Sequence, residues 1–211
     1  MLDRGWVWAL AHPRGGGELG RSWYLDGKLL NKRNTFTDTI ACARHLETRG
    51  HARRRGAAIF GGSAGGLLVG ACLNIAPQQF GAAVAAVPFV DVVSTMSDPS
   101  LPLTVTEWEE WGDPRTEPWA SYMLSYSPYD NIGAHDYPAM LVTPGLWDSQ
   151  VQYWEPAKYV ARLRERKTDH NPLLMHVNFA AGHGGASGRF ERLKERAREY
   201  AFFIDLAGQR E

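Results

Sequence analysis

The chain has 211 residues, of which 44% are apolar and 22% are charged, a balance that supports a hydrophobic core and excludes an intrinsically disordered protein. No apolar run approaches the roughly 20 residues that a membrane-spanning helix needs, so we expect no membrane association. The two cysteines, Cys42 and Cys72, fall in helix-like stretches and cannot build a disulfide framework, which favours a reducing, cytoplasmic location.

The net charge is zero, but the charges are unevenly distributed. Residues 90–155 contain eleven acidic residues and one basic residue, whereas the segments on either side are basic. Tryptophan and tyrosine interrupt this acidic block, which is typical of a folded surface rather than of a disordered tail. A folded acidic cleft attracts cationic ligands and disfavours nucleic acid, so we expect no nucleic-acid partner.

The expected elements alternate between strands and helices. In chain order they are a strand at 6–11, a helix at 35–49, a strand at 57–60, a helix at 64–75, a strand at 82–87, broken helical signals over 88–136, a strand at 139–143, a helix at 155–167, a strand at 173–179 and a helix at 189–206. Strands joined by helical crossovers form a mostly parallel sheet with helices on both faces, so residues 1–211 are predicted to form one α/β domain. Such sheets place their chemistry at the carboxyl ends of the strands.

The turn after the strand at 57–60 contains a G-x-S-x-G pattern that runs from Gly61 to Gly65. Between a strand and a helix, this pattern is typical of a nucleophile elbow, in which a strained turn exposes the hydroxyl of the central serine, Ser63. The amide of Ala64 would stand at a helix N-terminus and could donate to a developing oxyanion. The alternative interpretation is a glycine turn without chemistry.

A serine nucleophile needs a base, and the base needs a group that orients it. Asp148 follows the strand at 139–143, and His183 follows the strand at 173–179. Ser63, Asp148 and His183 therefore occur in the order that such hydrolases require, each at the carboxyl end of a strand. No spacing among histidines, cysteines and carboxylates resembles a metal site, so we expect neither a metal nor another cofactor.

Residues 15–20 also fit the G-x-G-x-x-G pattern of dinucleotide-binding folds. A proline and an arginine separate these glycines from the strand at 6–11, and no clear helix begins after them. The acid about 20 residues further on, Asp38, lies within a helical pattern rather than at a strand end. We therefore interpret the glycines as a tight loop.

Three segments of the chain resemble the prolyl oligopeptidase family of serine peptidases: residues 12–36, the elbow GGSAGGLL at 61–68, and DSQVQYWEPAKYVARLR at 148–164. Within the family they are most similar to the oligopeptidase B branch, which cleaves peptides after Arg or Lys. The resemblance implies an α/β-hydrolase catalytic domain with Ser63, Asp148 and His183 as its triad.

The resemblance also implies a role for the acidic block. Glu107 and Glu109 match the two glutamates with which the oligopeptidase B branch binds the basic side chain of its substrate. A carboxylate in a low-dielectric pocket pairs with guanidinium or ammonium and leaves neutral side chains without a partner. Gln150 stands where proline-specific members carry an arginine, which fits the oligopeptidase B branch better. The alternative is that the two glutamates form the solvated face of a helix.

The chain departs from the family at its start. Family members place a β-propeller before the hydrolase domain, and that domain begins with further strands and with a tyrosine that serves as the second oxyanion donor. The resemblance therefore implies a partial domain that lacks these parts, with an exposed sheet edge through which copies could associate. Removing one oxyanion donor typically costs about 10²–10³ in rate.

The sequence thus predicts a serine endopeptidase that hydrolyses short basic peptides after Arg or Lys through an acyl-enzyme. Two alternatives stay open. One is a carboxylesterase for small acyl groups that uses the same triad, and the other is a catalytically silent fragment that acts by associating with a partner.

Overall fold

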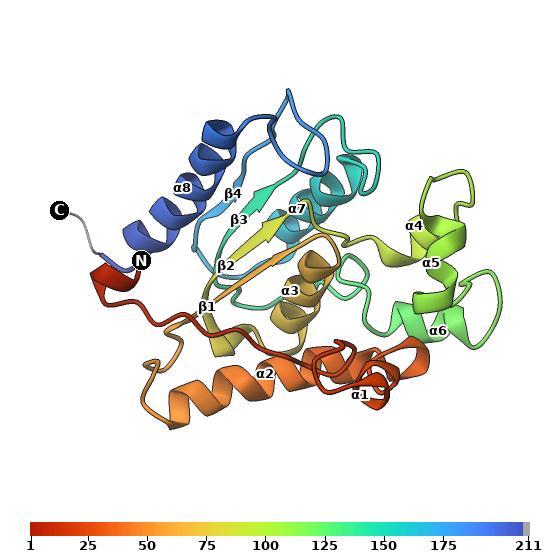
Figure 1. The fold of residues 1–211 in the computed structure, drawn as a ribbon, viewed down its shortest axis with the longest axis horizontal. Helices are drawn as coiled ribbons and strands as arrows, with labels where there is room; N and C mark the ends of the chain where they lie inside the picture. The colour runs from red at the N-terminus through yellow and green to blue at the C-terminus, as the bar shows by residue number, and fades with distance from the viewer. Residues whose placement is uncertain (209–211) are drawn as a thin grey trace.

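A four-stranded sheet stands at the centre of the computed structural model, which describes residues 1–208 apart from the side chain of residue 189. All neighbouring strands are parallel, in the order β1-β2-β3-β4. The strands are β1 (Ala57–Gly62), β2 (Phe80–Ala86), β3 (Ala139–Thr143) and β4 (Leu173–Met175) (Figure 1). The predicted mostly parallel α/β sheet is confirmed.

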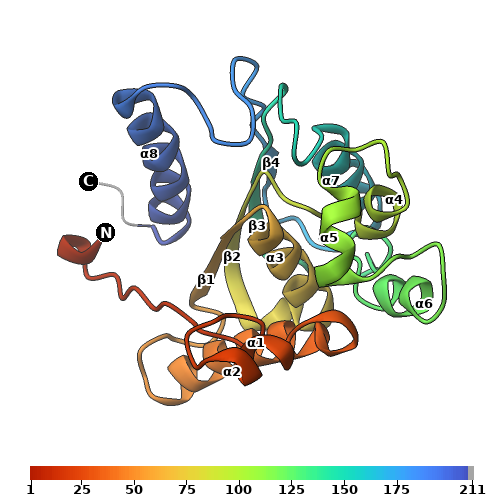
Figure 2. The same ribbon diagram turned by 45° about the vertical axis from the view of Figure 1, so that its right-hand side comes forward.

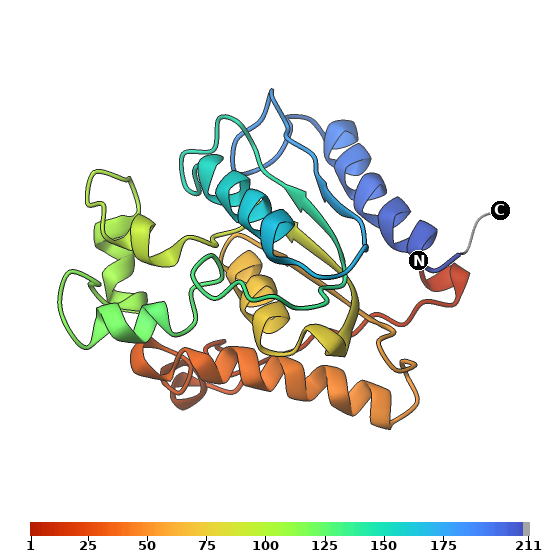
Figure 3. The ribbon, with the colours of Figure 1, turned by 180° about the vertical axis from the view of Figure 1, so that it is seen from behind.

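Helices cover both faces of this sheet (Figures 2 and 3). On one face lie α2 (Arg33–Thr48), α3 (Ala64–Ile75) and α7 (Trp154–Arg166), and on the other lies α8 (Arg189–Leu206). The shorter helices belong to the connections: α1 (Arg21–Leu25), α4 (Val92–Met96), α5 (Thr104–Trp111), α6 (Trp119–Leu124), and the 3₁₀ turns η1 (Leu2–Arg4), η2 (Leu29–Asn31) and η3 (Pro77–Gln79). The predicted helices at 64–75 and 189–206 match α3 and α8, and the segment at 88–136 contains three of the short helices.

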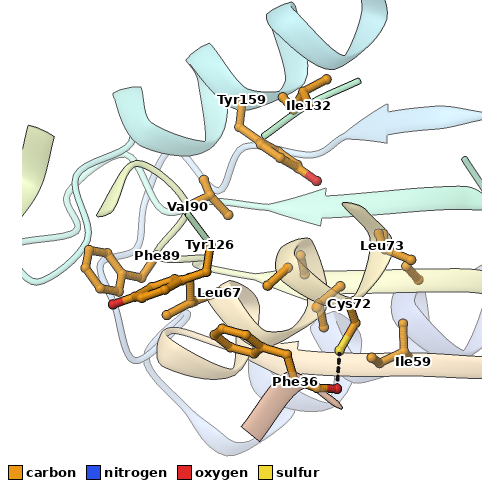
Figure 4. Packing of buried hydrophobic residues seen from close by; sticks show 14 of the residues in the cluster. Phe36, Ile59, Leu67, Cys72, Leu73, Phe89, Val90, Tyr126, Ile132 and Tyr159 are labelled. Atoms are coloured by element: carbon orange, nitrogen blue, oxygen red, sulfur yellow. Dashed lines mark hydrogen bonds between the residues drawn. The ribbon is translucent and has the colours of Figure 1, made fainter. Parts of the chain in front are cut away.

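The two faces of the sheet differ in how much apolar packing covers them. The larger buried cluster joins Phe36 of α2, Leu67 of α3 and Tyr159 of α7 to the sheet (Figure 4), and the Cys72 thiol donates to the Phe36 carbonyl at 3.6 Å. The smaller cluster lies on the α8 face, and its buried members are Ala82, Val84, Leu141 and Phe203. The face beneath α8 therefore depends on one helix and on the first residues of the chain, which pack against the same cluster.

The predicted strand at 6–11 is wrong. These residues form no regular element, and Val7, Trp8 and Leu10 are 61%, 58% and 73% exposed. An apolar run becomes a strand only where a neighbouring strand satisfies its backbone groups, and within residues 1–208 no strand pairs with this segment. For the same reason β1 is an edge strand. Association of copies through that edge stays a prediction.

The predicted strand at 173–179 is shortened, because β4 ends at Met175. Its neighbour β3 runs into Pro144, which has no N–H to donate to the ladder. Pairing resumes beyond this point, where Asn178 bridges to Gly145 and donates its amide to the Pro144 carbonyl at 2.9 Å. The segments that follow β3 and β4 consequently stay side by side.

Residues 1–208 contain no helix that combines the length and the apolar character needed to cross a bilayer. Both cysteines are free thiols, with Cys42 exposed and Cys72 buried. A cytoplasmic location stays a prediction.

A buried glutamate connects α7 to the segment that follows β2. Glu155 has no exposed surface, and its carboxylate accepts hydrogen bonds from the amides of Val90 at 3.1 Å and Asp91 at 3.0 Å and from the Thr95 hydroxyl. Burial raises the pKa of Glu155 to about 7, although these hydrogen bonds act in the opposite direction. The segment held in this way includes Phe89, whose amide donates to the Ser63 carbonyl at 3.1 Å.

Glu155 should make the protein less stable as the pH rises. Its pKa is raised from an ordinary 4.5 to about 7, so between these values the folded state holds a proton that the unfolded state has lost. The contribution of Glu155 to the free energy of unfolding is therefore complete below about pH 4.5 and is lost as the pH rises through about 7. Across this window we expect its contribution to the unfolding free energy from denaturant melts to fall by about 3 kcal/mol. Glu155→Gln should abolish this part of the pH dependence, whereas Glu165→Gln, at an exposed position of the same helix, should retain it. Identical pH profiles for wild type and Glu155→Gln would contradict the expectation.

Candidate active site

The predicted elbow is present between β1 and α3. Ser63 has φ +55° and ψ −120°, a conformation that a residue with a side chain rarely adopts and that marks functional turns. The Ser63 carbonyl accepts the amides of Gly66 at 2.8 Å and Leu67 at 3.3 Å, in addition to that of Phe89. These bonds hold the backbone of the turn and leave the serine side chain at the carboxyl end of β1.

The glycines of the motif permit close approach of the strand and the helix. A Cβ on Gly61 would lie 2.2 Å from the carbonyl oxygen of Gly65, and a Cβ on Gly66 would lie 2.3 Å from the Cβ of Pro88. Real Cβ atoms do not approach other atoms so closely, so any larger residue would displace the backbone around Ser63. The glycine pattern therefore has a packing reason as well as a chemical one.

We expect Gly61→Ala to destabilise the elbow and Gly65→Ala to be tolerated. The new methyl group at position 61 collides with backbone, whereas a Cβ at position 65 has no atom within 4 Å. Gly61→Ala should lower the unfolding free energy by about 1–3 kcal/mol in denaturant melts, as overpacking does. Gly65→Ala lies within a helix and should be neutral or slightly stabilising. Equal losses for the two variants would show that the close approach is not what requires Gly61.

The strands end level with one another, and this alignment brings the predicted site residues together at the carboxyl ends of the strands. Gly62 pairs with Ala86, and Ala86 pairs with Thr143. At these carboxyl ends the Nδ1–H of His183 donates to Oδ2 of Asp148 at 2.8 Å. Two residues 35 positions apart in sequence thus form the predicted hydrogen-bonded pair.

The carboxylate of Asp148 is held on both of its oxygens. Its side chain is 1% exposed, and Oδ1 accepts the amides of Gln150 and Val151, each at 2.9 Å, while Oδ2 receives the imidazole. Because a carboxylate partner requires a proton on Nδ1 of His183, the neutral form of the imidazole has its lone pair on Nε2. The imidazole is therefore in the tautomer that can accept a proton.

The structure shows less about two other predicted features, the contact between Ser63 and His183 and the oxyanion donor Ala64. Among residues 1–208, no hydrogen bond of 3.5 Å or less joins the Ser63 hydroxyl to His183, so the base role of His183 stays a prediction. The Ala64 amide is the first of α3 and has no acceptor among the hydrogen bonds of the described residues. A free amide at a helix N-terminus is suited to bind an anion, and the oxyanion role of Ala64 stays a prediction.

The two predicted specificity glutamates lie on α5, and they differ in their surroundings. Glu107 accepts a hydrogen bond from Nε1 of Trp111 at 2.8 Å. The side chain of Glu109 is 85% exposed and lies 3.4 Å from Nζ of Lys28. Helix α5 lies on the side of the molecule toward which the strands run (Figure 1). Both carboxylates therefore remain candidates for binding a cation.

Two buried lysines beside α5 were not predicted from the sequence. The side chains of Lys28 and Lys32 are 9% and 8% exposed. Lys32 donates to Glu110 at 2.8 Å, and the Tyr24 hydroxyl donates to the same carboxylate at 2.7 Å. These lysines neutralise part of the acidic block, and no local pattern indicates a pairing between residues about 80 positions apart.

The glycine segment at 15–20 forms a tight loop. The Gly15 amide donates to the Trp23 carbonyl at 2.9 Å, and Arg14 donates to both oxygens of Asp38 at 2.7 and 2.6 Å. The guanidinium lowers the pKa of Asp38. The acid that a dinucleotide site would need is thus bound to an arginine of the chain itself. Within the described residues, no cluster of three or more histidines, cysteines and acids could hold a metal ion.

Comparison with known proteins places these features in context. The profile described as "Prolyl oligopeptidase family" matches residues 1–210. The chain is 57% identical over 208 residues both to dipeptidyl aminopeptidase BI of Pseudoxanthomonas mexicana and to protease 2 of Moraxella lacunata, and each match covers 99% of this chain. The solved structure of oligopeptidase B from Leishmania major aligns with a TM-score of 0.94 and 52% identity, covering 97% of this chain and 28% of that one. The chain spans 29% and 30% of the length of the two curated relatives.

Proposed function

The chain belongs to the prolyl oligopeptidase family, and from this premise we propose that it is the catalytic part of a serine peptidase that works through an acyl-enzyme on Ser63. The observation that carries the proposal is the hydrogen bond between Asp148 and His183. It lies at the carboxyl ends of the strands, where Ser63 occupies its strained turn.

In this mechanism each residue of the site has one task. His183 accepts the proton of the Ser63 hydroxyl on Nε2 while the oxygen attacks the peptide carbonyl, and Asp148 holds the tautomer and stabilises the imidazolium. The Ala64 amide binds the oxyanion of the tetrahedral intermediate. His183 then gives the proton to the leaving amine, and water hydrolyses the acyl-enzyme by the same steps. No cofactor is needed.

We further propose that the preferred bond follows Arg or Lys and that Glu107 and Glu109 bind the basic side chain. The support is chemical: an 85% exposed carboxylate at Glu109 and a half-buried one at Glu107 stand on one short helix. Each carboxylate can accept charge-assisted hydrogen bonds from a guanidinium or ammonium group, which a neutral side chain cannot offer.

Replacing these glutamates should separate specificity from chemistry. For Glu107→Gln and Glu109→Gln we expect kcat/KM on an arginyl-amidomethylcoumarin substrate to fall about 10- to 100-fold, because a charged partner is lost. Hydrolysis of a neutral p-nitrophenyl ester should stay within about twofold of wild type. Glu117→Gln, an exposed acid in the same block, serves as the matched control. Equal losses on the amide and the ester would reject the specificity role.

Assays of the purified chain test the proposed function against its rivals. Cleavage of the arginyl amide together with labelling by a fluorophosphonate would support the peptidase. Turnover of short p-nitrophenyl esters without amide cleavage would favour a carboxylesterase. Failure to label, combined with an oligomer that depends on concentration, would favour a silent fragment.

Of the two relatives that are 57% identical, one is named a dipeptidyl aminopeptidase and the other simply a protease. Their names therefore leave open whether cleavage requires a free amino terminus. Basic peptides with free and with blocked amino termini decide between them. Cleavage of both kinds would support an endopeptidase. Strict dependence on a free amino terminus two residues before the cleaved bond would support dipeptidyl release.

A further inference from the structure

The loop that carries His183 connects β4 to α8, and its two halves are restrained differently. The first half is tied to the segment that carries Asp148: the Trp147 amide donates to the Ala181 carbonyl at 3.1 Å, and the Trp147 indole donates to the Phe179 carbonyl at 3.0 Å. The second half includes Gly184 and Gly185, which have no side chains to pack. Its position must therefore be set by other contacts.

Glu195 on α8 supplies those contacts. Its Oε1 accepts a hydrogen bond from Nδ2 of Asn178 at 2.6 Å and another from the amide of Ala186 at 3.1 Å. Asn178 precedes His183 and Ala186 follows it, so a single oxygen joins the two sides of the loop. Among the hydrogen bonds of the described residues, the one between Ala186 and Glu195 is the bond that links residues 184–187 to another element.

The second oxygen of Glu195 also touches the loop. Gly185 has φ +78°, and a Cβ at this position would lie 2.5 Å from Oε2 of Glu195. The backbone of the loop therefore lies directly on the carboxylate. The same carboxylate lines a cavity of about 310 Å³ between α8 and the strand ends, which is also lined by His183. Glu195 thus lies against the loop with both carboxylate oxygens, in a cavity that His183 also lines.

We propose that Glu195 is a positioning residue that closes the loop and so keeps the imidazole of His183 on Asp148, facing Ser63. Its catalytic consequence rests on the proposed function, whereas its effect on the loop does not. A carboxylate oxygen can accept both hydrogen bonds, and so can the amide oxygen of glutamine, but alanine can accept neither. Small displacements of a catalytic group are costly, since a shift of about 1 Å can lower a rate by about 10²-fold.

The experiment compares Glu195→Ala, Glu195→Gln and Glu191→Ala in the full chain. Glu191 lies one turn earlier on α8, is 50% exposed and pairs with Lys194, so it is the matched control. Two readouts are used: amide hydrogen exchange of residues 179–188 by mass spectrometry, and kcat and KM on the arginyl amide with the rate of fluorophosphonate labelling.

For Glu195→Ala we expect exchange of the loop to accelerate at least about tenfold. We also expect kcat and the labelling rate to fall about 10- to 100-fold with KM nearly unchanged. Glu195→Gln should recover most of both effects, and Glu191→Ala should match wild type. If Glu195→Ala is too unstable to measure, Asn178→Asp removes one donor while keeping the acceptor that binds the Ala180 amide, and it should shift both readouts in the same direction.

The outcomes keep the two proposals apart. Unchanged loop exchange in Glu195→Ala would overturn the positioning role whatever the activity, and so would faster exchange with unchanged kcat in an active enzyme. A wild-type chain that neither labels nor cleaves would refute the proposed function, while the exchange data would still decide whether Glu195 closes the loop.

Discussion

The Ser63→Ala variant is expected to lose fluorophosphonate labelling completely and to hydrolyse an arginyl amide about 10⁶-fold more slowly than wild type. In the proposed mechanism the hydroxyl oxygen of Ser63 forms the acyl bond, and no other group of the site can take over this role. The Asp148–His183 hydrogen bond and the Ala64 amide persist in the variant, which leaves only the small residual catalysis that binding and oxyanion contacts provide.

The control for this experiment is Ser149→Ala, because Ser149 is exposed and lies next to Asp148 in the chain. It should label and cleave like wild type. Because alanine must also adopt the φ of +55° at this position, circular dichroism is needed to check folding, and we expect Ser63→Ala to be folded. Labelling that survives in folded Ser63→Ala would identify another residue as the nucleophile.

The second large effect is expected for Asp148→Asn, which should lower kcat about 10⁴-fold at neutral pH. The asparagine Oδ1 can still accept the amides of Gln150 and Val151, so the loop should keep its shape. The amide nitrogen would face Nδ1 of His183 as a donor, which moves the imidazole proton to Nε2. His183 could then no longer accept the proton of Ser63.

Nitrogen NMR of the imidazole checks the cause directly, because the proton should be on Nδ1 in wild type and on Nε2 in Asp148→Asn. The matched control is Asp98→Asn, at an exposed position where the aspartate caps Ser100. A loss of less than tenfold in kcat for Asp148→Asn, with the tautomer changed, would show that the pair is structural rather than catalytic.

The parts of the fold that sequence could predict are those in which local pattern and tertiary need agree. Helix α3 follows from a run of small and apolar residues after Ser63, and β3 follows from the run Ala139–Thr143 between turn residues. The rule that parallel sheets carry chemistry at their carboxyl ends then selects Asp148 and His183, and the structure joins them.

The two incorrect strand predictions, at 6–11 and 173–179, have one physical cause. Whether a segment forms a strand depends on the strand beside it in the sheet. Residues 6–11 have the composition of a strand but no partner strand within residues 1–208, and Trp8 remains 58% exposed. The strand β4 ends early because Pro144 interrupts the ladder of its neighbour. Neither fact can be seen in the segment that it affects.

Contacts of charged residues were the least predictable. Glu155 and Glu195 look like ordinary polar positions of their helices, yet one is completely buried and the other binds both sides of a loop. Burial of Glu155 is tolerated because two backbone amides and a hydroxyl donate to it. Those donors come from residues about 60 positions away, so only the fold reveals them.

The uneven covering of the sheet has a consequence for how the molecule loses activity on warming. Because α8 supplies Phe203 to the small cluster and Glu195 to the histidine loop, detachment of this one helix would remove both at once. Such a sub-global opening requires less free energy than complete unfolding, since the larger cluster on the opposite face stays intact. If Glu195 acts as proposed, inactivation sets in at the temperature where the C-terminal helix detaches, below the melting temperature of the sheet.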